Sequence, residues 1–203
     1  KEVEGIVAIL ISDGLSGTLD SARAAQANLP DIAIEIIDSK AASMMLGFPV
    51  LAAARAAEAG ESLQAVADAG RELVGKTRIM FVVATLEYLH RGGRIGGAAK
   101  LLGSALQLKP ILEISGGMVR PMTKVRTRRK ALEKVHELLA EQVKAGDRVH
   151  MAVINVAAGE DAARFKDELE ARYRPVELMV SECSPAIGAH VGPGTVGVAY
   201  YVE

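Results

Sequence analysis

The strongest constraint on the fold is an unbroken aliphatic run, Ile6–Ile11, near the start of the chain. A strand buried on both faces of a parallel sheet has this composition, whereas a half-exposed strand alternates apolar and polar residues. The sequence then predicts a helix over residues 17–29, ended by Pro30, and a second apolar strand over residues 32–37. A strand, a helix and a strand in this order predict a parallel sheet.

Two more helices are predicted to complete this first half. Ser39 is placed to cap an Ala-rich helix that Gly60 ends, with Pro49 as the point where it could kink. Ser62 is placed to cap the next helix. We therefore predict a first α/β lobe over residues 1–76.

The pattern changes after residue 77. Apolar runs predict strands over residues 79–84, 110–114, 118–126, 149–156, 176–183 and 195–202. Helical spacing predicts helices near 98–106 and over 129–145 and 160–173. The turn signal Ser115-Gly-Gly117 joins two of the strands into a hairpin. These signals predict a second α/β lobe over residues 77–203, with a largely antiparallel sheet and helices on one side.

Composition excludes several classes of protein. The formal net charge is -1, so the chain as a whole does not demand nucleic acid or an anionic membrane. No apolar run approaches the roughly 18 residues of a membrane-spanning helix. Cys183 cannot form an intramolecular disulfide, and no signal-peptide pattern is present. We expect a cytoplasmic protein without stable membrane insertion.

The segment Ser12–Thr18 has the composition of an anion-binding turn. It lies where a buried strand leads into a helix, so backbone N–H groups, the positive helix end and hydroxyls can meet a carboxylate or phosphate. A simpler interpretation is that Ser16 or Thr18 only caps the helix. A nucleophile elbow would need the pattern G-x-S-x-G, and here the second glycine, Gly17, comes one position too early.

A second motif, Gly70–Thr77, matches the Walker A pattern of nucleotide-binding proteins. A phosphate-binding loop must follow a strand and open a helix. This segment instead closes a predicted helix and precedes a strand. Gly75 is better explained as a helix terminator.

Cations are concentrated in the first half of the second lobe. Between His90 and Leu132 there are ten lysines and arginines and only one acidic residue. The two-residue period of a strand places Arg120, Lys124 and Arg126 on one face. This pattern is typical either of a solvated face or of a site for phosphate or an acidic partner. Nucleic acid is disfavoured because stacking aromatic residues are missing from the run.

His190 lies in the segment Gly188–Gly194, which is predicted to be a rigid turn before the last strand. Such a turn can fix a side chain at a cleft, although a lone histidine in a turn is more often an ordinary surface residue. No second histidine or cysteine lies at metal-ligand spacing, so no metal is expected.

In combination and in this order, these motifs resemble the DegV family of bacterial fatty-acid-binding proteins, which includes the binding subunits of the fatty acid kinase system. The similar segments are Ser12–Thr18, Asp38–Ser43, Thr85–Ile95, Lys109-Pro110, Lys124–Arg126 and Ala189–Thr195.

The resemblance implies two α/β lobes with an acyl chain in an apolar tunnel between them. It implies that Ser12 and Ser16 bind the carboxylate of a long-chain fatty acid and that His190 approaches this carboxylate. Flexible side chains suited to lining the tunnel are Met44, Met45 and Phe48. The family also has a further segment at the front, with a Thr-Ser-Gln-Pro motif that this sequence lacks. We expect the first lobe to be incomplete at its N-terminus.

The resemblance further implies a lipid carrier without catalysis of its own. Arg94 and Arg126 would face a partner kinase and the phosphate as acyl phosphate forms, a step in phospholipid metabolism. No cofactor is implied other than the bound fatty acid. The alternatives are a serine hydrolase that uses Ser16 with His190 and a nucleotide-binding regulator. Asp13 departs from the family, in which serine is common at this position, and places an anion near the expected carboxylate site.

Overall fold

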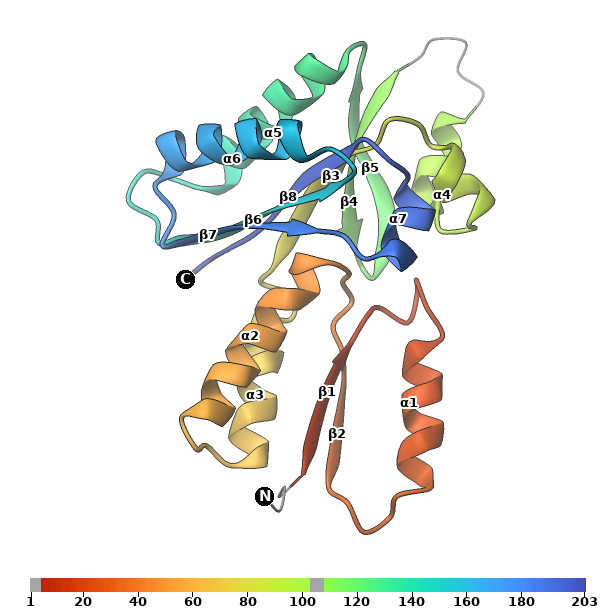
Figure 1. The fold of residues 1–203 in the computed structure, drawn as a ribbon, viewed down its shortest axis with the longest axis vertical. Coiled ribbons are helices and arrows are strands. Elements are labelled where there is room, and N and C mark those ends of the chain that lie inside the picture. The colour runs from red at the N-terminus through yellow and green to blue at the C-terminus, as the bar shows by residue number, and fades with distance from the viewer. Residues whose placement is uncertain (1–4, 103–107) are drawn as a thin grey trace. The chain divides into compact units, whose positions relative to one another are not determined.

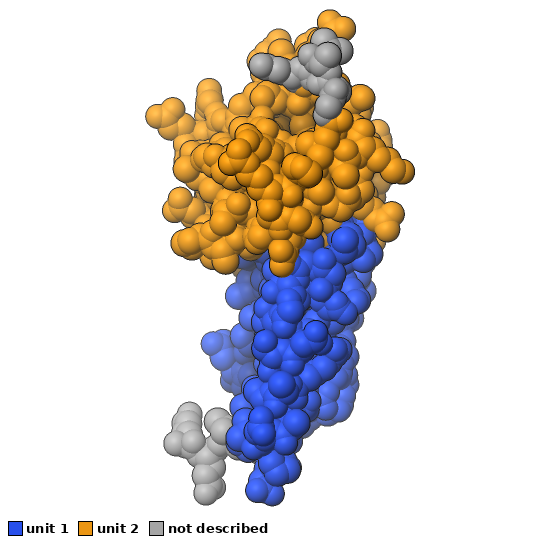
Figure 2. Space-filling model, turned by 90° about the vertical axis from the view of Figure 1, so that its right-hand side faces the viewer, with its two compact units in different colours: residues 1–77, 115–118 blue, residues 78–114, 119–203 orange. Residues whose placement is uncertain are grey.

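The computed structural model describes residues 5–102 and 108–203. The chain divides into two compact units, coloured separately in Figure 2. Unit 1 comprises residues 1–77 and 115–118, and unit 2 comprises residues 78–114 and 119–203.

Unit 1 is built on a parallel pair of strands. β1 (Ile6–Leu10) pairs with β2 (Ile34–Asp38), and α1 (Thr18–Ala27) connects them. α1 contacts β2, whereas α2 (Met44–Glu58) and α3 (Leu63–Leu73) contact β1. Figure 1 shows α1 on one side of the strand pair and α2 and α3 on the other. The predicted parallel arrangement is confirmed.

The helix caps of unit 1 only partly follow the prediction. The hydroxyl of Ser62 accepts a hydrogen bond from the Ala65 N–H at 3.3 Å, as expected for a cap of α3. The predicted cap of α2 by Ser39 is wrong, because Ser43 occupies the cap position. The Ser39 hydroxyl instead donates to the Leu10 carbonyl at 2.6 Å, which ties the end of β1 to the end of β2.

Unit 2 contains a six-stranded sheet in the order β5-β4-β3-β8-β6-β7. The strands are β3 (Arg78–Val82), β4 (Lys109–Ser115), β5 (Met118–Val125), β6 (Val149–Val156), β7 (Glu177–Glu182) and β8 (Thr195–Val202). β3 is antiparallel to β4 and β8, β6 is antiparallel to β8, and β6 is parallel to β7. The predicted, largely antiparallel sheet is confirmed.

Two long helices, α5 (Arg128–Gln142) and α6 (Gly159–Tyr173), cover one face of this sheet in Figure 1. Both are amphipathic, and their apolar side chains meet those of the central strands. The resulting core includes Val135 and Leu139 from α5, Phe165 from α6, and many strand residues. These helices and strands give unit 2 a core of its own.

Three short elements differ from the prediction. The helix expected near residues 98–106 is a 3-10 helix, η1 (Gly96–Leu101), and residues 103–107 lie outside the described part of the chain. α4 (Glu87–Arg91) precedes it and contacts α7 (Pro185–Val191). The prediction of a rigid turn around His190 is wrong, because His190 lies in the last turn of α7. Within residues 5–102 and 108–203, no helix is both long and apolar enough to span a bilayer.

Candidate functional site

The candidate site lies at the carboxyl ends of β1 and β2. The chain leaves β1 toward α1 and leaves β2 toward α2, and these helices lie on opposite sides of the strand pair (Figure 1). Loops that diverge in this way at adjacent parallel strands form the usual ligand crevice of α/β sheets. The two loops are joined by the Ser12 N–H, which donates to the Ala41 carbonyl at 2.9 Å.

Ser12 lies in the first of these loops and is fully buried, with 0% of its surface exposed. Its hydroxyl donates to the Gly117 carbonyl at 2.8 Å and accepts from the Gly14 N–H at 3.2 Å. Gly117 lies at the tip of the β4–β5 hairpin with a φ of 78°, and a Cβ there would lie 2.5 Å from the Ser12 hydroxyl oxygen. A glycine is thus needed for this close approach.

The neighbouring amides of the turn are also used internally. The N–H groups of Leu15 and Ser16 both donate to the Ser12 carbonyl at 3.0 Å. The Ser16 hydroxyl bonds with the hydroxyl of Thr18 at 2.7 Å. Neither hydroxyl caps α1, whose cap residue Gly17 provides no side-chain hydrogen bond, so the simple capping interpretation is wrong. The positive end of α1 opens into the turn without a side-chain cap.

An ion pair that the sequence did not predict lies beside the turn. Asp38 ends β2, and its carboxylate pairs with the Lys40 ammonium and accepts from the Lys40 N–H at 2.9 Å. Burial raises the pKa of Asp38, but the hydrogen bonds from Lys40 outweigh it and lower this pKa below its usual value. The hydrogen bond to Asp38 in turn raises the pKa of Lys40. Both side chains are therefore charged near neutral pH.

The predicted tunnel residues lie at the start of α2. Met45 and Phe48 are buried in unit 1, and Met44 is half-buried. They do not line the groove that follows β1 in this unit, so their role in a tunnel stays a prediction.

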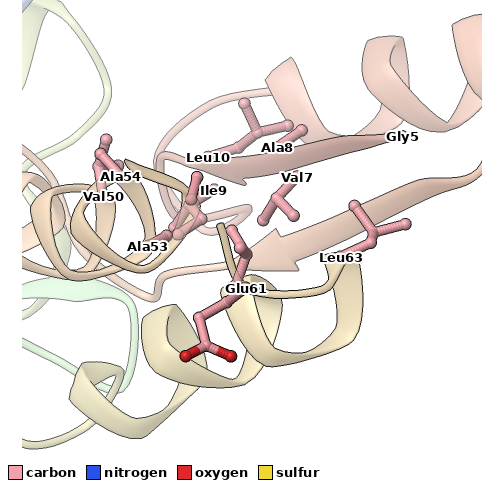
Figure 3. Close-up of a pocket in the computed structure, with 12 residues that line it drawn as sticks. Gly5, Val7, Ala8, Ile9, Leu10, Val50, Ala53, Ala54, Glu61 and Leu63 are labelled. Carbon is pink, nitrogen blue, oxygen red and sulfur yellow. The ribbon is translucent and has the colours of Figure 1, made fainter. Parts of the chain in front are cut away.

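That groove has a volume of about 620 Å³ and follows β1 (Figure 3). Consecutive residues of β1 from Val7 to Leu10 border it, together with aliphatic residues of α2 and α3. Glu61 is the charged residue among its twelve lining residues. Because side chains from both faces of β1 border the groove, it follows the edge of this strand.

In unit 2, the structure brings His190 and Arg94 to the same residue. A Cβ on Gly92 would lie 2.2 Å from His190 Nδ1, so the imidazole packs directly against the Gly92 backbone. The Arg94 guanidinium donates to the Gly92 carbonyl at 2.8 Å. The sequence singled out His190 and Arg94 separately, but it contained no signal that Gly92 joins them.

The predicted cationic face of β5 can be compared with the exposure of its side chains. Arg120, Lys124 and Arg126 are all exposed. Arg128, counted in the same cationic run, instead forms an ion pair with Asp161 at 2.7 Å. Other cations of the run are exposed as well, namely Arg91, Arg94, Lys100, Arg129 and Lys130.

The other motifs carry no site. The Walker A match covers the end of α3 and the residues just before β3, which is the wrong order for a phosphate-binding loop. Over residues 5–102 and 108–203, no group of three or more histidine, cysteine or acidic residues could hold a metal ion.

Comparison with known proteins agrees with this geometry. The family model described as an uncharacterised protein of the DegV family matches residues 1–203. A DegV domain-containing protein of Streptomyces coelicolor is 42% identical over 196 residues, 96% of this chain and 69% of that protein.

Two solved structures share the fold. One, described as fatty acid binding of a DegV family protein from Thermus thermophilus, has a TM-score of 0.91 and 35% identity, covering 100% of this chain and 72% of the other. DegV of Bacillus subtilis, described as a fatty acid binding protein, has a TM-score of 0.87 and 34% identity, covering 98% and 71%. The chain belongs to the DegV family.

Proposed function

We propose that this chain binds one long-chain fatty acid non-covalently, with the carboxylate at the Ser12–Thr18 turn of unit 1. The observation that carries the proposal is the buried Ser12 hydroxyl at the carboxyl ends of two parallel strands, beside the uncapped end of α1. The two solved relatives described as fatty acid binding support it, because both are more than 30% identical over nearly the whole chain.

A carboxylate suits this turn chemically. The Ser12 hydroxyl donates to the neutral Gly117 carbonyl, and a ligand carboxylate would offer it a charged acceptor. Hydrogen bonds to charged acceptors are stronger than those between neutral groups. Ser16 would contribute its hydroxyl once the bond to Thr18 rearranges. Most of the affinity would come from the acyl chain, at about 0.8 kcal/mol for each buried CH2 group.

We also propose His190 of unit 2 as a contact of the carboxylate and Met44, Met45 and Phe48 as residues that line the path of the acyl chain. Arg94 and Arg126 are proposed as contacts of the phosphate or of the partner. Arginine suits this role because its planar guanidinium binds phosphate oxygens in pairs. In this proposal the chain presents the carboxylate to a partner kinase, which carries out the phosphoryl transfer.

Native mass spectrometry of the purified chain tests the proposed ligand. The expected result is a complex with one fatty acid, either co-purified or formed after palmitate or oleate is added to delipidated protein. Protein that remains free of lipid after both treatments would refute the proposal.

Two assays separate the proposal from other functions. A fluorophosphonate probe labels an activated serine, so labelling of Ser16 would indicate a hydrolase instead of a carrier. Incubation of the loaded chain with ATP and the catalytic subunit of a bacterial fatty acid kinase should yield acyl phosphate. The chain alone should yield none.

A further inference from the structure

His190 is held against the backbone of another segment of unit 2. The ring edge with Nδ1 and Cε1 faces Gly92, where a Cβ would lie 2.2 Å from Nδ1 and 2.9 Å from Cε1. A second close approach lies next to it, because a Cβ on Gly192 would lie 2.3 Å from the ring of Tyr88. These two glycines let α7 and α4 pack closely enough to fix the plane of the imidazole.

This contact leaves the two ring nitrogens in different surroundings. His190 Nδ1 is buried and has no hydrogen-bond partner among the described residues. A proton on Nδ1 would therefore be a buried donor without an acceptor, which is costly. An unprotonated Nδ1 would be a buried acceptor without a donor, which is less rare than an orphaned N–H group. We therefore expect the neutral ring to carry its proton on Nε2, on the ring edge that is turned away from Gly92.

The chain just after His190 is anchored by Arg128. Its guanidinium donates to the Gly194 carbonyl at 2.5 Å and pairs with Asp161 of α6 at 2.7 Å. The Gly194 N–H donates to the Val156 carbonyl at 2.8 Å, so Gly194 is held at both its N–H and its carbonyl. Arg128 thus fixes the loop between α7 and β8 to the framework of the sheet and α6.

Thr195 links this loop to the end of α7. Its hydroxyl lies 3.1 Å from the Val191 carbonyl and 2.8 Å from the Gly192 carbonyl, the last carbonyls of the helix. A helix of seven residues has few hydrogen bonds of its own, so its orientation depends on such external contacts. Gly92, which touches the ring, and Arg128, which holds the loop after α7, therefore both contribute to the position of His190.

We propose that Gly92 and Arg128 are positioning residues that hold the His190 imidazole in one orientation, with Nδ1 sealed and Nε2–H offered to a ligand carboxylate. The identity of the ligand rests on the proposed function. The orientation of the ring does not depend on the proposed function, because it follows from contacts within unit 2.

The ring orientation is measured first, without ligand. Long-range 1H–15N spectra of the chain labelled on histidine nitrogens distinguish the two neutral tautomers, and His190→Gln identifies the signals of His190 among the four histidines. The expected result is a single Nε2–H tautomer. A predominant Nδ1–H tautomer, or an equal mixture of both, would overturn the proposal.

Two variants then perturb the ring, one by direct contact and one through the loop after α7. Gly92→Ala places a methyl group in the space of Nδ1, and Arg128→Ala releases the Gly194 carbonyl. In both, the His190 signals should shift or split, and the Kd for palmitate should rise about tenfold, equivalent to about 1.4 kcal/mol. Unchanged His190 signals in both folded variants would overturn the proposal, and backbone 1H–15N spectra verify folding.

Matched controls exclude a general effect of substitution. Gly159→Ala adds a methyl group where no atom lies within 4 Å, so the His190 signals should not move. Asp161→Asn removes the ion pair but leaves the bond from Arg128 to Gly194, so its effect should be smaller than that of Arg128→Ala. An effect of Asp161→Asn as large as that of Arg128→Ala would assign the role to the ion pair and overturn the proposed anchor.

The proposed contact with the carboxylate and the proposed orientation of the ring can be refuted independently. If His190→Gln leaves the Kd for palmitate unchanged, the proposed contact between His190 and the carboxylate is refuted. The tautomer and its response to Gly92→Ala still decide whether the ring is positioned as described.

Discussion

Replacement of Ser12 by alanine tests whether the buried hydroxyl holds the turn as well as a ligand. The serine side chain is completely buried, and its hydroxyl satisfies both the Gly117 carbonyl and the Gly14 N–H. Ser12→Ala leaves both groups without this partner. A buried polar group that loses its partner costs about 1 to 3 kcal/mol.

The expected loss of stability is therefore about 2 to 3 kcal/mol, since Gly14 is itself exposed and its N–H can reach water. For a chain of this size, each kcal/mol lowers Tm by about 2 to 4 °C. Ser16→Ala is the matched control, because the Ser16 hydroxyl bonds only with the exposed Thr18 hydroxyl in the ligand-free turn. It should change stability by less than about 0.5 kcal/mol.

The effect of Ser12→Ala on affinity should be smaller than its effect on stability. A ligand carboxylate takes a proton that the Gly117 carbonyl already accepts, so binding exchanges one hydrogen bond for a stronger one. The two hydrogen bonds differ in strength by about 1 kcal/mol, and the loss of this gain in Ser12→Ala corresponds to a five- to tenfold rise in Kd. Thermal unfolding and titration with palmitate measure the two quantities. A Ser12→Ala variant as stable as Ser16→Ala would refute the assigned role of the hydroxyl in the turn.

Three further predictions concern the framework around the site. Hydrogen bonds from Arg148 and then His150 lower the pKa of Glu203 from its usual 4.5 to about 2, so its stabilisation is complete above pH 4.5 and is lost as the pH falls through 2. In urea unfolding, Glu203→Gln should be less stable than wild type at pH 7, and this difference should shrink as the pH falls from 4.5 and vanish only below 2. Gly197→Ala should destabilise unit 2 by about 1 to 3 kcal/mol, because a Cβ there would lie 2.4 Å from the Met80 carbonyl oxygen; equal Tm values for the variant and wild type would contradict this packing. Ser62→Ala should lower the free energy of unfolding by about 1 kcal/mol, because α3 loses its cap. Urea unfolding measures this change, and an unchanged free energy would show that the bond to Ala65 contributes nothing to stability.

The strand order of unit 1 and the sheet type of unit 2 were predictable because both depend on local patterns. An unbroken aliphatic run such as Ile6–Ile11 indicates a parallel strand, and the pair Gly116-Gly117 indicates a hairpin. In the structure these residues form β1 and the turn between β4 and β5. Such signals involve neighbours in sequence, so no tertiary contact is needed to interpret them.

Predictions failed where a distant partner decided the role of a residue. Ser39 has the chemistry of a helix cap, but its hydroxyl is bound by Leu10, 29 residues away. Arg128 was counted in the cationic run, and its partner Asp161 lies 33 residues away. The helix around His190 could have been found locally, since Ser184 followed by proline is a common helix start.

The charges around the turn indicate how a site of this kind selects its ligand. Lys40 is paired with Asp38, and Asp13 adds an exposed negative charge, so the loops around Ser12 present no excess of cations. A strongly charged small anion would gain little there from long-range attraction. A fatty acid gains instead from its tail, at about 0.8 kcal/mol for each buried CH2 group, and needs from the turn only a fixed orientation for its head. In the proposed function, a neutral hydroxyl and the end of a helix would supply that orientation, and no free lysine would be required in the turn.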